Sequence, residues 1–307
     1  MSAADLEASA GRRARDLGLG ALGALFFGLT IVFNRALARD GLGAPTALGV
    51  RYGIAGVLLL CVLRARRRPL LPPSGERLRA ALLGFALYAA ESTFFFMALE
   101  RGTAAAAALL FYTYPAVVAV TEAALGRIRL RGLTLLALAL GVSGGAVVAV
   151  GGGRVAITTA GVWFMVGSVA MYSIYVLVSD TLTRTDPLTA AAWSALGASA
   201  GVFLIGIAFG NLHLPGPGAM AALGANGVAT AAAFTLFFLV LGRLGPSRTA
   251  IVMALEAVTG IVLSAVFLGE AVHLAVAVGG ASVLAGAVIA AAVVPPSIEQ
   301  VESAAAP

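Results

Sequence analysis

The sequence predicts an all-α integral membrane protein in which ten transmembrane helices form two inverted five-helix repeats around a central cavity. Three features lead to this fold class: an apolar composition, a succession of long apolar stretches, and a weak repeat between the two halves. Of the 307 residues, 60% are hydrophobic and 11% are charged, and the mean hydropathy is +1.00. Soluble domains carry about 25% charged residues. The composition therefore excludes an ordinary soluble enzyme and a disordered chain, and the single cysteine, Cys61, excludes a disulfide-stapled domain.

The apolar stretches have the length of about 20 residues that a helix needs to cross a bilayer core about 30 Å thick. They are continuous, whereas a membrane β-barrel would show alternating strands of about ten residues. The first stretch follows three arginines like a signal peptide, but its length and its Asn34-Arg35 pair favour a retained span. The predicted spans cover residues 17–38, 44–63, 78–99, 103–124, 132–150, 160–179, 188–209, 219–241, 246–268 and 273–294.

The distribution of arginine predicts the orientation. All 20 basic residues are arginines. With ten spans, fifteen of them fall on the side of the N-terminus and three on the other side, and two lie within or beside spans. By the positive-inside rule, both termini are expected in the cytoplasm. The net charge of +6 then reflects topology and anionic headgroups, and no nucleic-acid partner is expected.

A weak repeat divides the chain into two halves. Tyr114 and Glu256, Gly126 and Gly269, and Gly145 and Gly286 lie in similar surroundings, 142, 143 and 141 residues apart. We expect five-helix repeats at residues 17–150 and 160–294, with short mobile cytoplasmic tails at 1–16 and 295–307. Because five spans are an odd number, the second repeat crosses the membrane in the opposite direction. Such inverted repeats are typical of secondary transporters, which bind substrate near the midplane.

These features resemble the EamA type of the drug/metabolite transporter superfamily over essentially the whole chain, with YddG-type bacterial amino-acid exporters as the nearest branch. The resemblance rests on Gly28 with Asn34-Arg35, Pro45 with Arg51-Tyr52, Ala98-Leu99 with Ala106 to Pro115, Leu255-Glu256, and Gly269-Glu270. It implies an inner-membrane exporter of small metabolites, with a cavity walled by helices 1–4 and 6–9 and with helices 5 and 10 at the periphery. The chain departs from the family pattern at Ala257, where proline is usual, and at Arg127, opposite Glu270 of the second half.

Two carboxylates at membrane depth are candidate site residues, because a charge at the bilayer centre costs about 2.5–3.5 kcal/mol on insertion scales. Glu91 shares one helical stripe with Tyr88, Ser92 and Phe95, while Leu82, Phe85 and Ala89 are expected to face lipid. Glu256 lies in the family motif. The alternative for both is a structural carboxyl bonded to a neighbouring helix. Arg51 can pair with either acid, although snorkelling to the interface is favoured, and Glu122 and Asp180 are expected at the interface.

Neutral polar and aromatic residues complete the candidate site. We expect Asn34, Asn226 and Thr230 to hold polar groups of a substrate, and Tyr88, Tyr112, Tyr114 and Trp163 to supply apolar walls, with Tyr172 on the same face as Ser168. The alternatives are helix–helix cross-links for the polar residues and an interfacial belt for Trp163. Pro115 is expected to kink its helix and to act as a hinge.

The sequence thus predicts a secondary-active or facilitative exporter of small metabolites, with apolar or aromatic amino acids as the favoured substrates and a proton carried by Glu91 or Glu256 as a candidate coupling ion. No Walker loop, metal-ligand cluster or membrane-depth histidine is present, so neither a cofactor nor an enzyme is expected. The alternatives are a sugar-phosphate or nucleotide-sugar antiporter, which would need several basic residues in its cavity, a drug exporter, a passive channel and an intramembrane enzyme.

Overall fold

The computed structural model describes residues 3–39, 41–102, 104–130, 132–151, 157–210, 212–213, 215–269 and 274–293. Their regular structure is helical, apart from an isolated bridge between Gly102 and Ile157. The elements are α1 (Ala3–Arg39), α2 (Ala44–Ala65), α3 (Arg77–Leu82), the π-helix η1 (Leu83–Tyr88), α4 (Ala89–Leu99), α5 (Ala104–Phe111), α6 (Tyr114–Ala124), α7 (Gly132–Gly151), α8 (Thr159–Ser179), α9 (Pro187–Ala208), α10 (Ala219–Leu244), α11 (Pro246–Met253), α12 (Leu255–Leu268) and α13 (Leu274–Val293).

Seven helical segments in the described part of the chain are long and apolar enough to cross a membrane. Two shorter apolar segments lie in α7 and α13. The predicted span 103–124 is divided between α5 and α6, so neither piece has the full length of a span. The seven segments cover Ala14–Ala38, Ala44–Ala65, Arg77–Leu99, Thr159–Ser179, Pro187–Ala208, Ala219–Leu244 and Pro246–Phe267.

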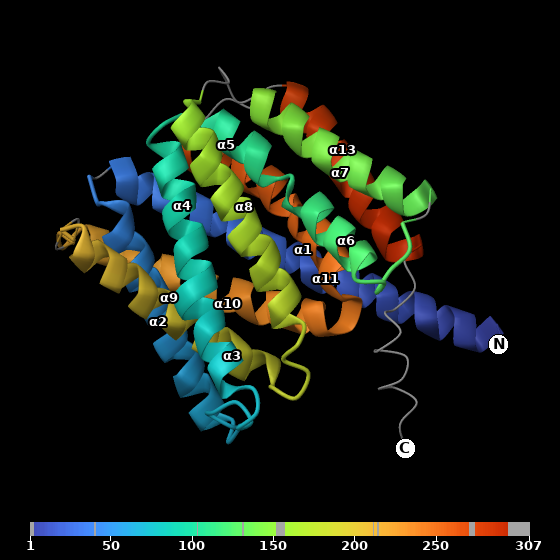
Figure 1. Cartoon of the computed structure of the whole chain (residues 1–307), viewed down its shortest axis with the longest axis horizontal. Helices are drawn as coiled ribbons and strands as arrows, with labels where there is room; N and C mark the ends of the chain where they lie inside the picture. Colours follow the sequence, from blue (N-terminus) through green and yellow to red (C-terminus); the bar gives the residue numbers. More distant parts are fainter. Residues whose placement is uncertain are drawn as a thin grey trace.

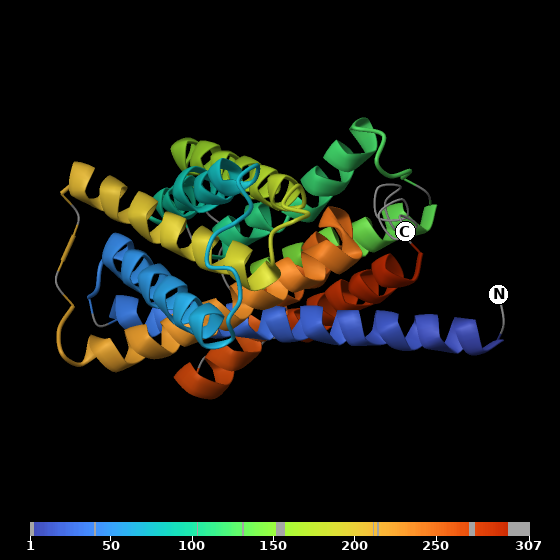
Figure 2. The ribbon, with the colours of Figure 1, turned by 90° about the horizontal axis from the view of Figure 1, so that it is seen from below.

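The amino-terminal segment, for which a short tail was expected, is helical. Helix α1 already begins at Ala3 and continues without a break to Arg39, and Figure 2 shows its first turns extending beyond the other helices. Alanine, leucine, glutamate and arginine, all strong helix formers, dominate this segment. An ion pair of 2.6 Å between Asp16 and Arg243 connects α1 with α10. The expected tail at 295–307 lies outside the described residues.

The helices pack as a set of crossed pairs. Helix α1 packs against α10 and α12, and α8 packs against α4, α5 and α6. Helix α2 packs against α9 and α10, whereas η1 packs against α9. Helices α7 and α13 lie alongside each other at one edge of the bundle (Figure 1). The large buried side chains are therefore concentrated between the inner helices α1, α2, α8, α10 and the helices that cross them.

Glycines allow the backbones of η1 and α9 to approach closely. A Cβ atom built on Gly197 would lie 2.7 Å from the amide nitrogen of Phe85, and one on Gly201 would lie 2.6 Å from the Cβ of Ala89. Ala89 is accordingly fully buried, contrary to the lipid-facing position expected for it, whereas Leu82 and Phe85 are 45% and 42% exposed. The π-helical turn in η1 explains the difference, because its wider winding alters the helical register before Ala89.

Polar bonds fasten the loop between α2 and α3 to the loop before α9. The buried carboxylate of Glu76 accepts hydrogen bonds from the backbone nitrogen of Arg184 (3.1 Å) and from the hydroxyl of Thr185. Asp186 forms an ion pair of 2.5 Å with Arg68 and caps α9 through the backbone nitrogen of Leu188. This cluster therefore holds two loops, distant in sequence, at one end of the bundle.

Replacing Glu76 with alanine is expected to lower the free energy of unfolding by about 1.5–3 kcal/mol, the usual contribution of hydrogen bonds to a charged group. Thermal unfolding of the full chain in detergent should show this as a lower Tm. Glu100→Ala is the control, because that side chain is 72% exposed and its contact with Arg101 is long at 3.4 Å. Equal Tm values for the two variants would contradict the fastening role of Glu76.

Candidate functional site

Aromatic rings from five helical segments meet in the interior of the bundle. Tyr88 of η1 lies 4.9 Å from Tyr175 of α8 and 5.0 Å from Phe234 of α10, measured between ring centroids. Tyr52 of α2 lies 5.5 Å from Tyr88. We call the set Tyr52, Tyr88, Tyr114, Tyr172, Tyr175, Phe234 and Phe237 the central aromatic cluster. Most of its ring pairs are tilted or edge-to-face, and Tyr175 stacks on Tyr172 and on Phe237. Edge-to-face and offset-stacked pairs are the geometries that aromatic rings prefer.

The cluster extends to the broken segment α5–α6. Tyr114 and Tyr172 make an edge contact of 4.7 Å, and Phe111 lies 5.4 Å from Tyr172. Tyr112 is buried and contacts Phe111 at 5.9 Å. Of the predicted aromatic residues, the structure therefore brings together Tyr88, Tyr112, Tyr114 and Tyr172. Trp163 does not join them, because it is 71% exposed on the outside of α8. This exposure is compatible with the alternative interpretation of Trp163 as an interfacial residue.

A chain of hydrogen bonds passes through one side of this cluster. Nη2 of Arg51 donates to the hydroxyl of Tyr52 (2.7 Å), which lies 3.1 Å from the hydroxyl of Ser92. Ser92 and Ser168 donate to the two carboxylate oxygens of Glu91, at 3.0 and 3.3 Å. We call these five residues the Arg51–Glu91 chain. It joins α2, α4 and α8, and it places a cation and an anion in the apolar interior with hydroxyl groups between them.

Arg51 is one residue that the sequence interpretation placed incorrectly. Snorkelling was expected, yet its side chain is only 8% exposed, and its guanidinium lies 4.5 Å above the ring of Tyr52. Its Nε and Nη1 atoms are buried without a hydrogen-bond partner. The signal in the sequence was its place about two turns inside α2, next to a tyrosine. An arginine at that depth can stay inside when an aromatic ring covers it.

Two helical segments are interrupted at corresponding places. The turn at Tyr112 and Thr113 separates α5 from α6, and the turn at Ala254 separates α11 from α12. Pro115 stands in the first turn of α6 and is buried. It accounts for the first interruption, because proline lacks an amide hydrogen and disfavours a helical residue before it. Interrupted helices are a common way to line substrate sites in transporters.

Glu256 stands in the first turn of α12, directly after the second interruption. Electrostatic interactions connect it with Glu91 and with Arg51. The two acids predicted from the sequence therefore belong to one region, together with the cation Arg51, whose association with these acids was the less favoured interpretation. This arrangement can neutralise a solute that carries both signs of charge.

A hydrogen bond connects the two interruptions. The hydroxyl of Tyr114 donates to the backbone oxygen of Ala250 over 3.0 Å. Tyr114→Phe is expected to reduce the free energy of unfolding by about 1 kcal/mol, a typical value for one buried hydrogen bond, while keeping the ring contact with Tyr172. The Tm in detergent measures this loss. Tyr114→Ala should lower the Tm further, because it also removes the ring; an unchanged Tm in the phenylalanine variant would mean that the bond contributes nothing.

The predicted polar residues of α1 and α10 bond to one another. Nδ2 of Asn226 donates to Oδ1 of Asn34 over 2.8 Å, and the hydroxyl of Thr230 donates to the backbone oxygen of Asn226. The bond between Asn226 and Asn34 fits the helix cross-link that was the alternative interpretation, whereas the bond of Thr230 lies within α10. The Oδ1 atom of Asn226 is nevertheless buried without a partner.

Glu122 is another residue that the structure places differently. It was expected at the interface, yet it is 2% exposed at the end of α6. Its carboxylate accepts hydrogen bonds from the backbone nitrogen (2.9 Å) and the hydroxyl of Ser247, in the first turn of α11. A carboxylate is stabilised there by the unpaired amides of the helix start. Glu122 therefore has a structural partner.

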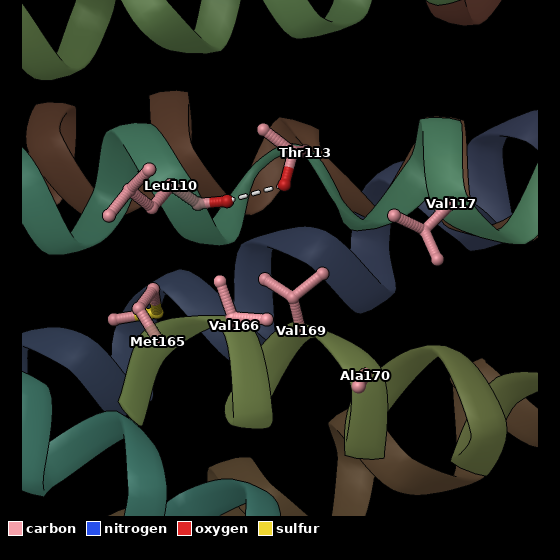
Figure 3. A pocket seen from close by; sticks show the side chains of 7 residues that line it. All are labelled: Leu110, Thr113, Val117, Met165, Val166, Val169 and Ala170. Atoms are coloured by element: carbon pink, nitrogen blue, oxygen red, sulfur yellow. Dashed lines mark hydrogen bonds between the residues drawn. The ribbon is translucent and has the colours of Figure 1, made fainter. Parts of the chain in front are cut away.

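An apolar groove lies on the flank of the bundle, between α5–α6 and α8 (Figure 3). Its volume is about 280 Å³, and its lining residues are Leu110, Thr113, Val117, Met165, Val166, Val169 and Ala170. The hydroxyl of Thr113 is bonded to the backbone oxygen of Leu110, and Val117 and Val166 are exposed. None of these lining residues is charged. The central aromatic cluster and the Arg51–Glu91 chain, which hold buried charges, are therefore the better candidate site.

Comparison with known proteins gives one family and one fold. The model of the EamA-like transporter family matches residues 17–150 and again residues 159–292. A solved structure described only as "Crystal structure of protein" is similar to this chain with a TM-score of 0.73 and 21% sequence identity, covering 88% of this chain and 96% of the other. At that identity the likeness shows the fold alone. No curated protein matches the chain.

Proposed function

The chain belongs to the EamA-like transporter family, and on this premise we propose that it exports amino acids across the bacterial inner membrane by alternating access. Apolar and aromatic amino acids are the favoured substrates. In this proposal ten spans form two inverted five-helix repeats, residues 17–150 and 160–294, with both termini in the cytoplasm. Glu91 or Glu256 carries a proton if transport is coupled.

The packing of the helices supports the inverted arrangement. Helix α1 packs against α10 and α12, and α8, its counterpart in the second repeat, packs against α4 and α6. Helices α2 and α9 pack against each other, as do α7 and α13. If each helix is replaced by its counterpart in the other repeat, these pairs of neighbouring helices stay the same. A two-fold axis between the repeats requires this symmetry. The interruptions before Tyr114 and before Leu255 agree with the same exchange.

The observation that carries the proposed substrate is the Arg51–Glu91 chain within the central aromatic cluster. Helices of both repeats contribute to it, which is where a transporter with inverted repeats binds its solute. The three charges of Arg51, Glu91 and Glu256 suit a zwitterion, which brings one charge of each sign. The rings of Tyr88 and Phe234 suit an apolar side chain. A phosphate ester, by contrast, favours several basic groups at once.

Countertransport in proteoliposomes tests this function. Vesicles containing the purified chain and loaded with one unlabelled amino acid should take up the same labelled amino acid to a saturable extent, with the apolar and aromatic ones transported best. Protein-free vesicles measure leakage. Uptake that stays proportional to concentration would indicate a passive channel, and no uptake with any of the amino acids would reject the proposed substrate class.

A further inference from the structure

The guanidinium of Arg51 has hydrogen-bonding capacity that the protein does not use. Only Nη2 is bonded, to the hydroxyl of Tyr52, while Nε and Nη1 are buried without a partner. Buried polar groups are normally paired, because an unpaired donor loses its bonds to water and gains nothing in return. For a charged group in the interior this loss is larger. The unpaired nitrogens therefore mark a place where an acceptor is missing.

The neighbouring acid does not fill this place. Both carboxylate oxygens of Glu91 are engaged by serine hydroxyls, Ser92 and Ser168, and Glu91 reaches Arg51 only through Ser92 and Tyr52. The ion pairs formed among the described residues, such as Arg68 with Asp186, lie elsewhere. The carboxylate of Glu91 therefore does not accept a hydrogen bond from Nε or Nη1 of Arg51.

We propose that Arg51 binds the carboxylate of the transported solute and is its anchor in the membrane. This inference rests on the proposed function and specifies the chemical group that the site recognises. A guanidinium presents parallel N–H donors that match the two oxygens of a carboxylate. The ring of Tyr52 holds the guanidinium from one side, so the anchor is in place before the solute arrives.

A second unpaired atom lies on the helix that covers this part of α2. Oδ1 of Asn226 is buried and lacks a donor, and the next residue, Gly227, packs against the backbone of α2, where a Cβ atom would lie 3.4 Å from the backbone oxygen of Arg51. Among the described residues, Arg51 on α2 thus has buried donors without an acceptor, and Asn226 on α10 has a buried acceptor without a donor. An amino acid supplies both, through its carboxylate and its ammonium group.

Binding of L-phenylalanine and of L-phenylalaninamide to the purified full chain in detergent tests the anchor. The amide keeps the ring and the amino group but lacks the anion. We expect the amide to displace labelled L-phenylalanine at least about tenfold less effectively than the unlabelled acid does, the factor that corresponds to losing charge-assisted hydrogen bonds. In Arg51→Gln this preference should fall below about threefold, and Arg51→Lys should recover part of it.

Arg35→Gln is the matched control, because Arg35 is also an arginine inside a helix but bonds to Ser264; this variant should keep the preference of the wild type. Equal displacement by acid and amide in the wild type would overturn the anchor while leaving amino-acid transport intact, as would a preference that persists in Arg51→Gln. Failure of the wild type to bind any amino acid would reject the proposed function itself. The comparison of acid with amide in the wild type needs no variant, so poor folding of Arg51→Gln does not prevent a decision.

Discussion

Replacing Gly84 with leucine is expected to prevent assembly of the native bundle. A Cβ atom on Gly84 would lie 2.7 Å from the backbone nitrogen of Ala198 and closer still to the backbone oxygen of Ser194. These are backbone atoms of α9, so the clash cannot be relieved by a side-chain rotation. Overpacking a core usually costs about 1–3 kcal/mol, and separating η1 from α9 should exceed that range.

The measurement is the yield of monodisperse protein in detergent together with its Tm. Gly242→Leu is the matched control: it lies in helix α10, and a Cβ atom added there would have no atom within 4 Å. In such an open position leucine is a better helix former than glycine by up to about 1 kcal/mol. If Gly84→Leu gave the yield and the Tm of the wild type, the close approach of the two backbones would have to be abandoned.

Replacing Glu91 with glutamine is expected to reduce transport at least about tenfold, because it removes the buried negative charge at one end of the Arg51–Glu91 chain. Glutamine keeps the size of the side chain but removes the negative charge that compensates Arg51. It also replaces one of the two oxygens that accept from Ser92 and Ser168 with an NH₂ group. Uptake into proteoliposomes, corrected for the amount of folded protein, measures the effect.

Two comparisons separate the charge from general damage. Glu100→Gln, at an exposed position, should transport like the wild type. The double variant Arg51→Met with Glu91→Leu removes both charges and should recover thermal stability without recovering transport, since well-packed apolar residues often replace buried charged groups of opposite sign without loss of stability. Normal transport by Glu91→Gln would exclude Glu91 from the site.

The same variant tests the proposed coupling to protons. Glutamine cannot bind or release a proton, so a transporter that uses Glu91 for this purpose should lose its response to a pH gradient when the carboxyl is replaced. Glu256→Gln provides the parallel comparison, because the two acids interact electrostatically. Wild-type uptake that is the same with and without a pH gradient would exclude proton coupling through either acid.

The sequence was sufficient to predict the family, and the family model confirms this assignment over both halves of the chain. Helical structure followed from composition, because lipid leaves a helix as the only open segment that satisfies its own backbone. The position of Glu91 as a buried acid was also predictable, since a charge in an apolar run needs a partner inside the protein, whereas Glu256 is half-buried. These arguments depend on local sequence alone.

Other residues were misplaced because their surroundings depend on distant segments. Arg51 is held inside by the ring of Tyr52, whose hydroxyl is in turn within hydrogen-bond distance of Ser92 in α4. Glu122 is buried because the first turn of α11 offers it unpaired donors. Trp163 is exposed because α8 presents its other face to the interior.

The sequence by itself thus showed that the chain lies mainly in lipid, that it is helical and that it contains two repeats. Hydrophobicity and backbone hydrogen bonding act along the chain, so both can be inferred from local sequence. Only the tertiary structure decided which polar atoms are paired inside the bundle. Pairing depends on the distances between helices far apart in sequence, and so the unpaired nitrogens of Arg51 became visible only there.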